Sequence, residues 1–343
     1  MSLVDAQPVV SIAQCGENEA VDGSVNGATK GMGWRDGRLA LRLQGVHAPA
    51  ARVVRVAWRL HGPADAPCVA VLGGISADRQ VAGEGGWWNG QTRHGAALDA
   101  ARWRILSFDW IDADDVEAPA VETIDQASVL AGILDALGIS RLHALVGSSY
   151  GAMVGLAFAA AHPRKVERLI AIAGAHRAHP QASALRAIQR NIVRLAGAHG
   201  DVGTGLALAR QLAMIGYRSP REMGKRFRSA PVLGVEGVRV ASQDWMEEAG
   251  RRFTRHFSAS RFISLSESID LHRIDPTEVR VPSTLIGFNT DQLVPVADLC
   301  ALQAGLGARC ELHVLDSDYG HDAFLKEHSA MGHVLEAALR ESA

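Results

Sequence analysis

Residues 141–163 read RLHALVGSSYGAMVGLAFAAAHP, and this stretch decides the fold. The apolar run before Gly147 is typical of a buried strand, and the small apolar residues after Ser149 predict a helix that ends near Pro163. Between them, Gly147 to Gly151 form a G-x-S-x-G motif. A serine at a sharp turn from strand to helix is the arrangement of a nucleophile elbow, which makes Ser149 the candidate nucleophile. The alternative is a tight turn rich in glycine and serine.

Strands and helices alternate on both sides of this stretch. Residues 67–76 and 103–110 are short apolar runs typical of buried parallel strands, and residues 122–140 carry apolar side chains at helical spacing. Residues 166–175 predict another strand. The alternation indicates a mostly parallel sheet with helices on both faces, and residues 37–62 predict an antiparallel hairpin before it.

The chain divides into a core and two other segments. Residues 1–33 are polar and rich in glycine, so we expect a loose N-terminal arm. Residues 179–274 are helical in pattern, rich in arginine and poor in strand-like runs, which predicts an inserted helical cap. The α/β core is expected to comprise residues 34–178 and 275–343.

Composition excludes several classes of partner. The chain has 343 residues, with 35 Lys and Arg against 37 Asp and Glu, so it lacks the basic excess that binding to nucleic acid or an anionic membrane requires. The four cysteines have neither zinc-site nor disulfide spacing, and we expect reduced thiols and no metal site. No signal peptide and no run of about 18 apolar residues is evident, so a cytoplasmic protein is expected.

A serine nucleophile needs a base to take its proton and an acid to orient that base. The strand-like residues 281–289 are followed by Asp291, and residues 308–315 are followed by a loop that contains His321. Because the carboxyl ends of parallel strands meet at one edge of a sheet, Ser149, Asp291 and His321 are the predicted catalytic triad. Other candidates nearby are expected to be caps, surface carboxylates or packed side chains: Asp298, Asp316, Asp318 and His313.

The tetrahedral intermediate of acyl transfer needs backbone N–H donors for its oxyanion. Tyr150, directly after the nucleophile, is the first candidate. Gly73 or Gly74, in the loop LGGIS, is the second, because missing side chains let the backbone approach the acyl carbonyl. The alternative for this loop is an ordinary tight turn.

From about residue 55 to its end, the chain resembles the homoserine O-acyltransferases of the α/β-hydrolase fold. The resemblance is carried by GGWWNG at 85–90, GSSYGAM at 147–153, LARQLAMIGYRS at 208–219 and YGHDAFL at 319–325. It implies the α/β-hydrolase fold with an inserted helical cap, and transfer of an acyl group from acyl-CoA, the co-substrate, to the hydroxyl of homoserine in methionine biosynthesis. It also implies a ping-pong reaction, no further cofactor and a homodimer formed through cap helices.

The resemblance assigns roles where its motifs match. The predicted triad matches that of the family, and Asp322 matches the residue that holds the acceptor's ammonium group. Arg210 matches an arginine that contacts the substrate, and Tyr217 lines the same pocket. The alternatives are an ordinary loop carboxylate for Asp322 and a solvated cap arginine for Arg210.

The acyl donor and the acceptor remain open at this stage. The usual GPG turn of the family is replaced by RHG at 93–95, in a loop that borders the active site. The chain resembles most the shorter branch associated with succinyl-CoA, which favours succinyl-CoA over acetyl-CoA, with L-homoserine as acceptor. The alternatives are a homoserine O-acetyltransferase, a serine O-succinyltransferase and, in another class, an esterase of the same fold.

Overall fold

The computed structural model describes residues 10–12, 33–235 and 237–340. Its strands are β1 (Val10–Ile12), β2 (Trp34–Leu43), β3 (Arg52–His61), β4 (Cys68–Leu72), β5 (Arg104–Phe108), β6 (Ala144–Ser148), β7 (Leu169–Ile172), β8 (Val232–Gly234), β9 (Gly237–Arg239), β10 (Ser283–Phe288) and β11 (Cys310–Leu315). Nine of them form one sheet in the order β1-β2-β3-β5-β4-β6-β7-β10-β11. Pairing is antiparallel from β1 to β5 and parallel from β5 to β11. The predicted hairpin and the mostly parallel sheet are confirmed.

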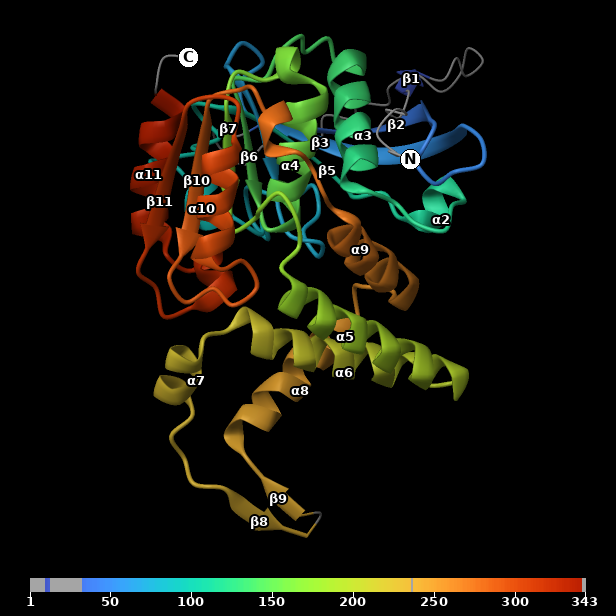
Figure 1. Cartoon of the computed structure of the whole chain (residues 1–343), viewed down its shortest axis with the longest axis vertical. Coiled ribbons are helices and arrows are strands. Elements are labelled where there is room, and N and C mark those ends of the chain that lie inside the picture. Colours follow the sequence, from blue (N-terminus) through green and yellow to red (C-terminus); the bar gives the residue numbers. More distant parts are fainter. Residues whose placement is uncertain (1–9, 13–32, 236, 341–343) are drawn as a thin grey trace.

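The helices cover both faces of this sheet (Figure 1). They are α1 (Asn89–Thr92), α2 (Ala113–Val116), α3 (Thr123–Ala136), α4 (Tyr150–Ala161), α5 (Pro180–Ala198), α6 (Val202–Tyr217), α7 (Pro220–Arg226), α8 (Ala241–Thr254), α9 (Ala259–Leu271), α10 (Val296–Gly305) and α11 (His328–Arg340), with 3-10 turns η1 (Pro163–Lys165), η2 (Pro276–Glu278) and η3 (Gly320–Leu325). Within the described part of the chain, no helix combines the length and apolarity needed to cross a membrane.

The central strands are mostly apolar because both of their faces are buried. Alternate residues of a strand point to opposite faces, and in β6 Leu145 enters the core beneath α3 and α4. Its neighbour Val146 enters the core beneath α11, on the other face. A strand buried on both sides therefore reads as a continuous apolar run, which is the pattern of residues 144–147.

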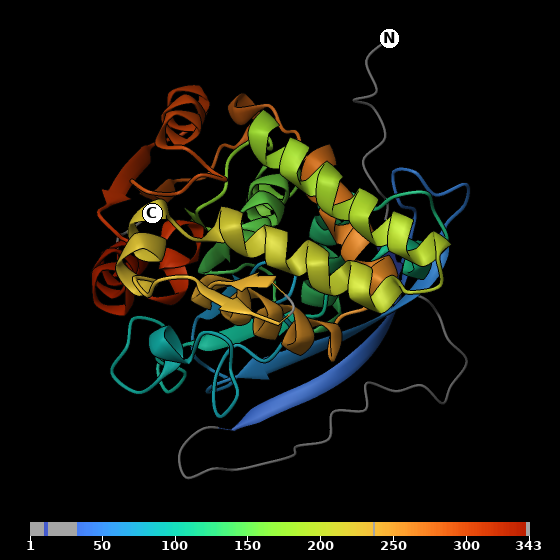
Figure 2. The same cartoon turned by 90° about the horizontal axis from the view of Figure 1, so that it is seen from below.

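The inserted helices lie beyond the carboxyl ends of the parallel strands. Between Pro180 and Leu271 the chain forms α5 to α9, and in Figure 1 α5 and α6 lie just below the sheet, with α7 and α8 farther from it. Figure 2, seen from below, shows α5 and α6 side by side across this end of the molecule. We call residues 179–274 the cap segment; its division from the core as a separate unit stays a prediction.

The structure departs from the predicted elements at three places. Within residues 1–33, β1 pairs antiparallel with β2; apart from residues 10–12 and 33, the predicted arm lies outside the described residues. The cap segment, expected to be helical, also contains the hairpin of β8 and β9. The helical run over residues 244–274 is interrupted after α8, because the Ser258 side chain accepts a hydrogen bond from the Arg261 N–H and begins a new helix, α9.

Candidate active site

Ser149 occupies the turn between β6 and α4 in a strained conformation. Its φ of 54° and ψ of −117° are rarely adopted by a residue with a side chain. The turn is fixed by hydrogen bonds from the Ser149 N–H to the Ile172 carbonyl (2.8 Å) and from the Gly151 N–H to the Gly73 carbonyl (2.9 Å). The strain turns the hydroxyl outward at the carboxyl edge of the sheet, which is the geometry of a nucleophile elbow.

Both glycines of the motif are required by close backbone packing. A Cβ on Gly147 would lie 2.2 Å from the Gly151 carbonyl oxygen, and a Cβ on Gly151 would lie 2.3 Å from that of Leu72. Real Cβ atoms do not approach other atoms so closely. The motif therefore allows α4 to begin directly against the sheet, with Ser149 at its first turn.

The predicted triad residues meet at this edge of the sheet. The Ser149 hydroxyl Oγ lies 2.8 Å from His321 Nε2, and His321 Nδ1 lies 2.7 Å from Asp291 Oδ2. The other carboxylate oxygen of Asp291, Oδ1, accepts from the N–H groups of Leu293 (2.8 Å) and Val294 (3.0 Å). Asp291 is thus fixed by the backbone after β10 and orients a histidine that contacts the serine.

The surroundings of His321 favour its protonated form. Burial lowers the pKa of His321, but the charge and hydrogen bond of Asp291, together with the charge of Asp322, outweigh burial and raise this pKa above its usual value. Arg186 acts in the opposite direction. A base with a raised pKa can accept the serine proton and hold it while the tetrahedral intermediate forms.

The carboxylates that compete for the acid's role have other partners or positions. Asp318 pairs with Arg221 and Lys225, and Asp316 also contacts Arg221, as predicted for surface carboxylates. Asp298 lines the active-site cavity from the first turn of α10, whereas the carboxylate hydrogen-bonded to His321 is that of Asp291.

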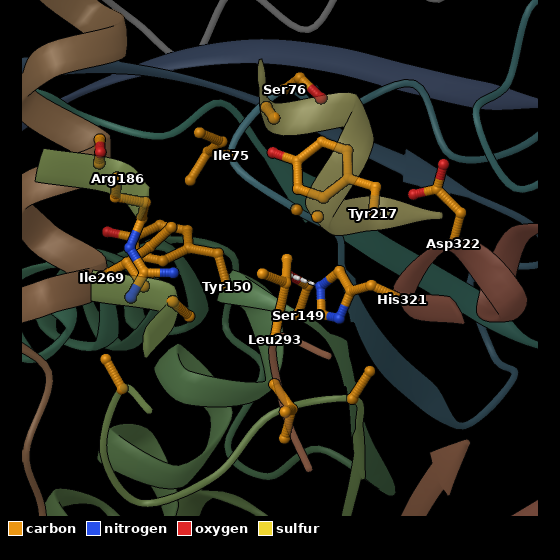
Figure 3. A pocket seen from close by; sticks show the side chains of 18 of the residues that line it. Ile75, Ser76, Ser149, Tyr150, Arg186, Tyr217, Ile269, Leu293, His321 and Asp322 are labelled. Carbon is orange, nitrogen blue, oxygen red and sulfur yellow. Dashed lines mark hydrogen bonds between the residues drawn. The ribbon is translucent and has the colours of Figure 1, made fainter. Parts of the chain in front are cut away.

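A cavity of about 220 Å³ lies above Ser149 and His321. Its walls come from the loop after β4, from α5 and α6 of the cap segment and from η3. Figure 3 shows Ile75, Arg186, Tyr217 and Asp322 arranged around the contact between Ser149 and His321. The cap segment therefore covers the nucleophile and restricts the access of water to it.

The candidate oxyanion donors are only partly where the sequence places them. Tyr150 and Gly74 line the cavity, and neither N–H has a hydrogen-bond partner among the described residues. Gly73 is not part of the cavity wall, and its carbonyl accepts from the Gly151 N–H instead. Ile75, which the sequence reasoning missed, also lines the cavity with its N–H free of any described partner. The donor from this loop is thus Gly74 or Ile75.

The residues assigned by resemblance also meet at the cavity. The rings of Tyr217 and His321 stack with centroids 6.0 Å apart, and the Arg210 guanidinium lies 5.2 Å from the Tyr217 ring centroid. No carboxylate among the described residues pairs with Arg210. Asp322 Oδ2 lies 3.1 Å from Arg218 Nη2. Burial raises the pKa of Asp322, against the effect of Arg218 and other cations.

Two arginines of the site were missed by the sequence reasoning. Arg218 positions Asp322, and its own Nη1 is held by Glu222 at 3.0 Å. Arg186, on α5, lines the cavity and donates from Nε to Asp270 Oδ1 at 2.8 Å. Its Nη1 has no partner among the described residues and is available to a ligand.

The described residues contain no cluster of three His, Cys, Asp or Glu side chains placed to hold a metal ion. Of the described cysteines, Cys68 is buried, and burial raises the pKa of its thiol to about 12. Of the triad, Ser149 and His321 line the cavity, together with Arg186, Arg210 and Asp322.

Comparisons with known proteins agree with this geometry. A family model described as "alpha/beta hydrolase fold" matches residues 81–328. A homoserine O-succinyltransferase of Xanthomonas campestris pv. campestris is 47% identical over 310 residues, covering 89% of this chain and 84% of the relative. A homoserine O-acetyltransferase of Clavibacter michiganensis subsp. michiganensis is 30% identical, covering 89% of this chain and 94% of the relative.

A solved structure with low sequence identity to this chain has the same fold. The crystal structure of a homoserine O-acetyltransferase from Bacillus anthracis matches with a TM-score of 0.79 at 18% identity, covering 90% of this chain and 98% of the other. The elbow, the order of the triad and the relatives lead to one conclusion: this chain belongs to the homoserine O-acyltransferases of the alpha/beta hydrolase fold.

Proposed function

We propose that this enzyme transfers the succinyl group of succinyl-CoA to the hydroxyl of L-homoserine through an acyl-enzyme on Ser149. The observation that carries the choice of donor and acceptor is the 47% identity to a homoserine O-succinyltransferase over 89% of the chain. The hydrogen-bonded series Ser149, His321 and Asp291 supports the chemistry. A cytoplasmic location and a homodimer belong to the same proposal.

In the first half-reaction, Ser149 Oγ attacks the thioester carbonyl while its proton passes to His321 Nε2, 2.8 Å away. Asp291 stabilises the imidazolium that forms. The N–H of Tyr150 and one from the loop after β4 stabilise the oxyanion. The C–S bond then breaks, and the proton on Nε2 goes to the sulfur of the departing CoA.

In the second half-reaction, the homoserine hydroxyl gives its proton to His321 Nε2 and attacks the acyl-enzyme. Asp322 receives the ammonium group of homoserine, and Arg210 receives its carboxylate. Arg210 suits this role because the described residues offer it no carboxylate partner, and a guanidinium can bind a carboxylate through two parallel hydrogen bonds. Breakdown of the second tetrahedral intermediate frees Ser149, which recovers the proton from His321.

Arg186 supports a dicarboxylic acyl group. It lines the same cavity as Ser149, and its charge acts on His321, so the guanidinium lies within electrostatic reach of the reacting atoms. Asp270 engages Nε and Nη2 of Arg186 but leaves Nη1 for the distal carboxylate of a succinyl group. An acetyl group has no atom that could use this donor.

The competing function is hydrolysis of the acyl-enzyme by water. The cover of α5 and α6 over Ser149 favours transfer, because an acyl-enzyme open to solvent would be hydrolysed.

The test is to incubate the enzyme with succinyl-CoA and follow free thiol with and without homoserine. Homoserine-dependent thiol release with O-succinylhomoserine as product supports the proposal. Thiol release that ignores homoserine, with no O-acyl product by mass spectrometry, would establish an esterase. The ratio of kcat/KM for homoserine and serine decides the acceptor.

A further inference from the structure

Trp110, in the loop after β5, contacts both segments of the chain that offer N–H donors to the oxyanion. Its side chain is 3% exposed and does not line the active-site cavity. The indole Nε1–H donates to the carbonyl of Gly74, in the loop after β4, at 3.1 Å. The rings of Trp110 and Tyr150 meet in a T-shaped contact with centroids 5.0 Å apart. One buried side chain therefore joins the loop after β4 to the start of α4.

The hydrogen bond to the Gly74 carbonyl also sets the direction of the next N–H group. The Gly74 C=O and the Ile75 N–H belong to one peptide unit, which is planar and trans, so the two groups point in opposite directions. Since the carbonyl points towards the buried indole, the Ile75 N–H points away from it. Ile75 lines the cavity, and its N–H has no hydrogen-bond partner among the described residues.

The same geometry turns the Gly74 N–H in another direction. The carbonyl in its own peptide unit is that of Gly73, which accepts from the Gly151 N–H at the start of α4. Because the C=O and N–H of a trans peptide oppose each other, the Gly74 N–H points away from the nucleophile elbow. Of the two N–H groups that this loop offers, that of Ile75 is therefore the better placed for the oxyanion.

The loop has little else to hold the peptide unit between Gly74 and Ile75. The Gly74 carbonyl has one further partner, the Ala77 N–H at 2.9 Å, which closes a turn whose member Ser76 is exposed. A Cβ on Gly74 would meet nothing within 4 Å, so packing does not confine this residue. Since glycine has more backbone freedom than any other residue, the orientation of this peptide unit depends on its hydrogen bonds.

Trp110 is itself fixed by its neighbours. Its carbonyl accepts from Arg261 Nη2, on α9, at 2.6 Å. Its ring also makes a T-shaped contact with Phe108, with centroids 5.2 Å apart. Its other ring partner, Tyr150, is held in turn through its hydroxyl, 2.7 Å from Ser268 Oγ on α9. The indole therefore offers the loop after β4 a donor whose own position is set by the core and by α9.

We propose that Trp110 is a positioning residue for acyl transfer, whose indole N–H holds the peptide unit between Gly74 and Ile75 with the Ile75 N–H directed at the oxyanion. This rests on the proposed function only in that Ser149 must be acylated, and it applies to any acyl group. A donor that is already oriented needs no reorganisation when negative charge develops. Loss of the indole N–H should therefore slow formation of the tetrahedral intermediate and leave binding of the substrate unchanged.

The test measures acylation of Ser149 by p-nitrophenyl acetate, which requires neither CoA nor homoserine, and by succinyl-CoA. Trp110→Phe keeps an aromatic ring against Tyr150 and removes the N–H donor. We expect the single-turnover rate constant of acylation to fall about tenfold with both substrates, while their dissociation constants stay the same. This is less than the roughly 100- to 1,000-fold cost of removing an oxyanion donor, because the Ala77 N–H still holds the Gly74 carbonyl.

Trp103→Phe is the matched control. The Trp103 indole also donates to a backbone carbonyl, that of Ala97 at 3.0 Å, but Trp103 does not line the cavity. This variant should acylate as fast as the wild-type enzyme, and urea midpoints of both variants measure any loss of stability. If Trp110→Phe does not fold, benzothienylalanine in place of Trp110 keeps the shape of the indole with sulfur instead of N–H, and it should give the same tenfold loss.

Acylation at the wild-type rate without the indole N–H of Trp110 would overturn the inference. So would an equal loss in Trp103→Phe, or weaker substrate binding in place of slower acylation. A wild-type enzyme that p-nitrophenyl acetate acylates but that transfers no succinyl group to homoserine would contradict the proposed function alone. A wild-type enzyme that neither substrate acylates would overturn both.

Discussion

Replacing Arg186 by leucine should change which acyl donor the enzyme prefers. The side chain lines the cavity above Ser149, and its Nη1 is the donor left for a succinyl carboxylate. A hydrogen bond between two charged groups contributes about 1.5–3 kcal/mol. We therefore expect Arg186→Leu to lower kcat/KM for succinyl-CoA by about 10- to 150-fold. Acetyl-CoA lacks the carboxylate, so its kcat/KM should change by less than about threefold.

The structure also shows why this substitution should leave the fold intact. Asp270 loses Arg186 but keeps Arg190, whose Nη1 lies 2.7 Å from its Oδ2, so no buried carboxylate is left alone. Arg190→Leu is the control, since it removes the other pair of Asp270 and Arg190 itself does not line the cavity, although it donates to Ser266 of the cavity wall. The assay is thiol release with each donor at saturating homoserine. An equal loss for both donors in Arg186→Leu, or the same selectivity change in Arg190→Leu, would refute the reasoning.

The remaining predictions concern the base, the elbow and the assembly. His321 must be neutral to accept the serine proton, and Asp322 raises its pKa, so Asp322→Asn should shift the acid limb of single-turnover acylation to lower pH; a fixed limb would contradict this. Gly151→Ala should lower stability to urea by about 1–3 kcal/mol or prevent folding, because its Cβ would meet the Leu72 carbonyl. Gly224→Ala, in open space on α7, should be neutral or stabilise by up to about 1 kcal/mol, and similar urea midpoints for the two variants would refute the packing argument. Sedimentation should give a dimer, and a monomer at micromolar concentration would exclude the proposed assembly.

The triad could be predicted from the sequence because each member follows a strand that is unmistakable. The strands β6 and β10 precede Ser149 and Asp291; both are buried at every position and are therefore mostly apolar in sequence. The topology then brings the loops after these strands to one edge of the sheet. The order of the three residues in the chain and their positions after strands were sufficient to predict the triad without interatomic distances.

Arg186, the proposed acyl-group contact, could not be predicted, because its sequence pattern is the same as that of a solvated helix face. Arg186, Arg190 and Arg194 repeat every four residues along α5, as charged residues on exposed helices often do. Only packing distinguishes them: the Arg186 side chain is 13% exposed and lines the cavity, while that of Arg194 is 51% exposed. The same holds for Arg218, whose role depends on where Asp322 lies.

The missed hairpin and the exclusion of Gly73 as an oxyanion donor each have a physical cause. The strands β8 and β9 are short and exposed, with Leu233 81% exposed, so they show no alternation between buried and exposed positions. In the loop after β4, the glycine pair pointed to close backbone approach, which is correct for Gly73. That approach serves the Gly151 N–H, however, and the cavity begins one residue later.

The central claim is that Ser149 carries the succinyl group taken from succinyl-CoA. The most direct test is mass spectrometry of the intact protein after brief exposure to an equal mixture of succinyl-CoA and acetyl-CoA without homoserine, followed by peptide mapping. The account predicts one succinyl group per chain on the peptide containing Ser149, absent from Ser149→Ala and discharged by homoserine. An unmodified protein, an adduct on another residue or a predominant acetyl adduct would contradict it.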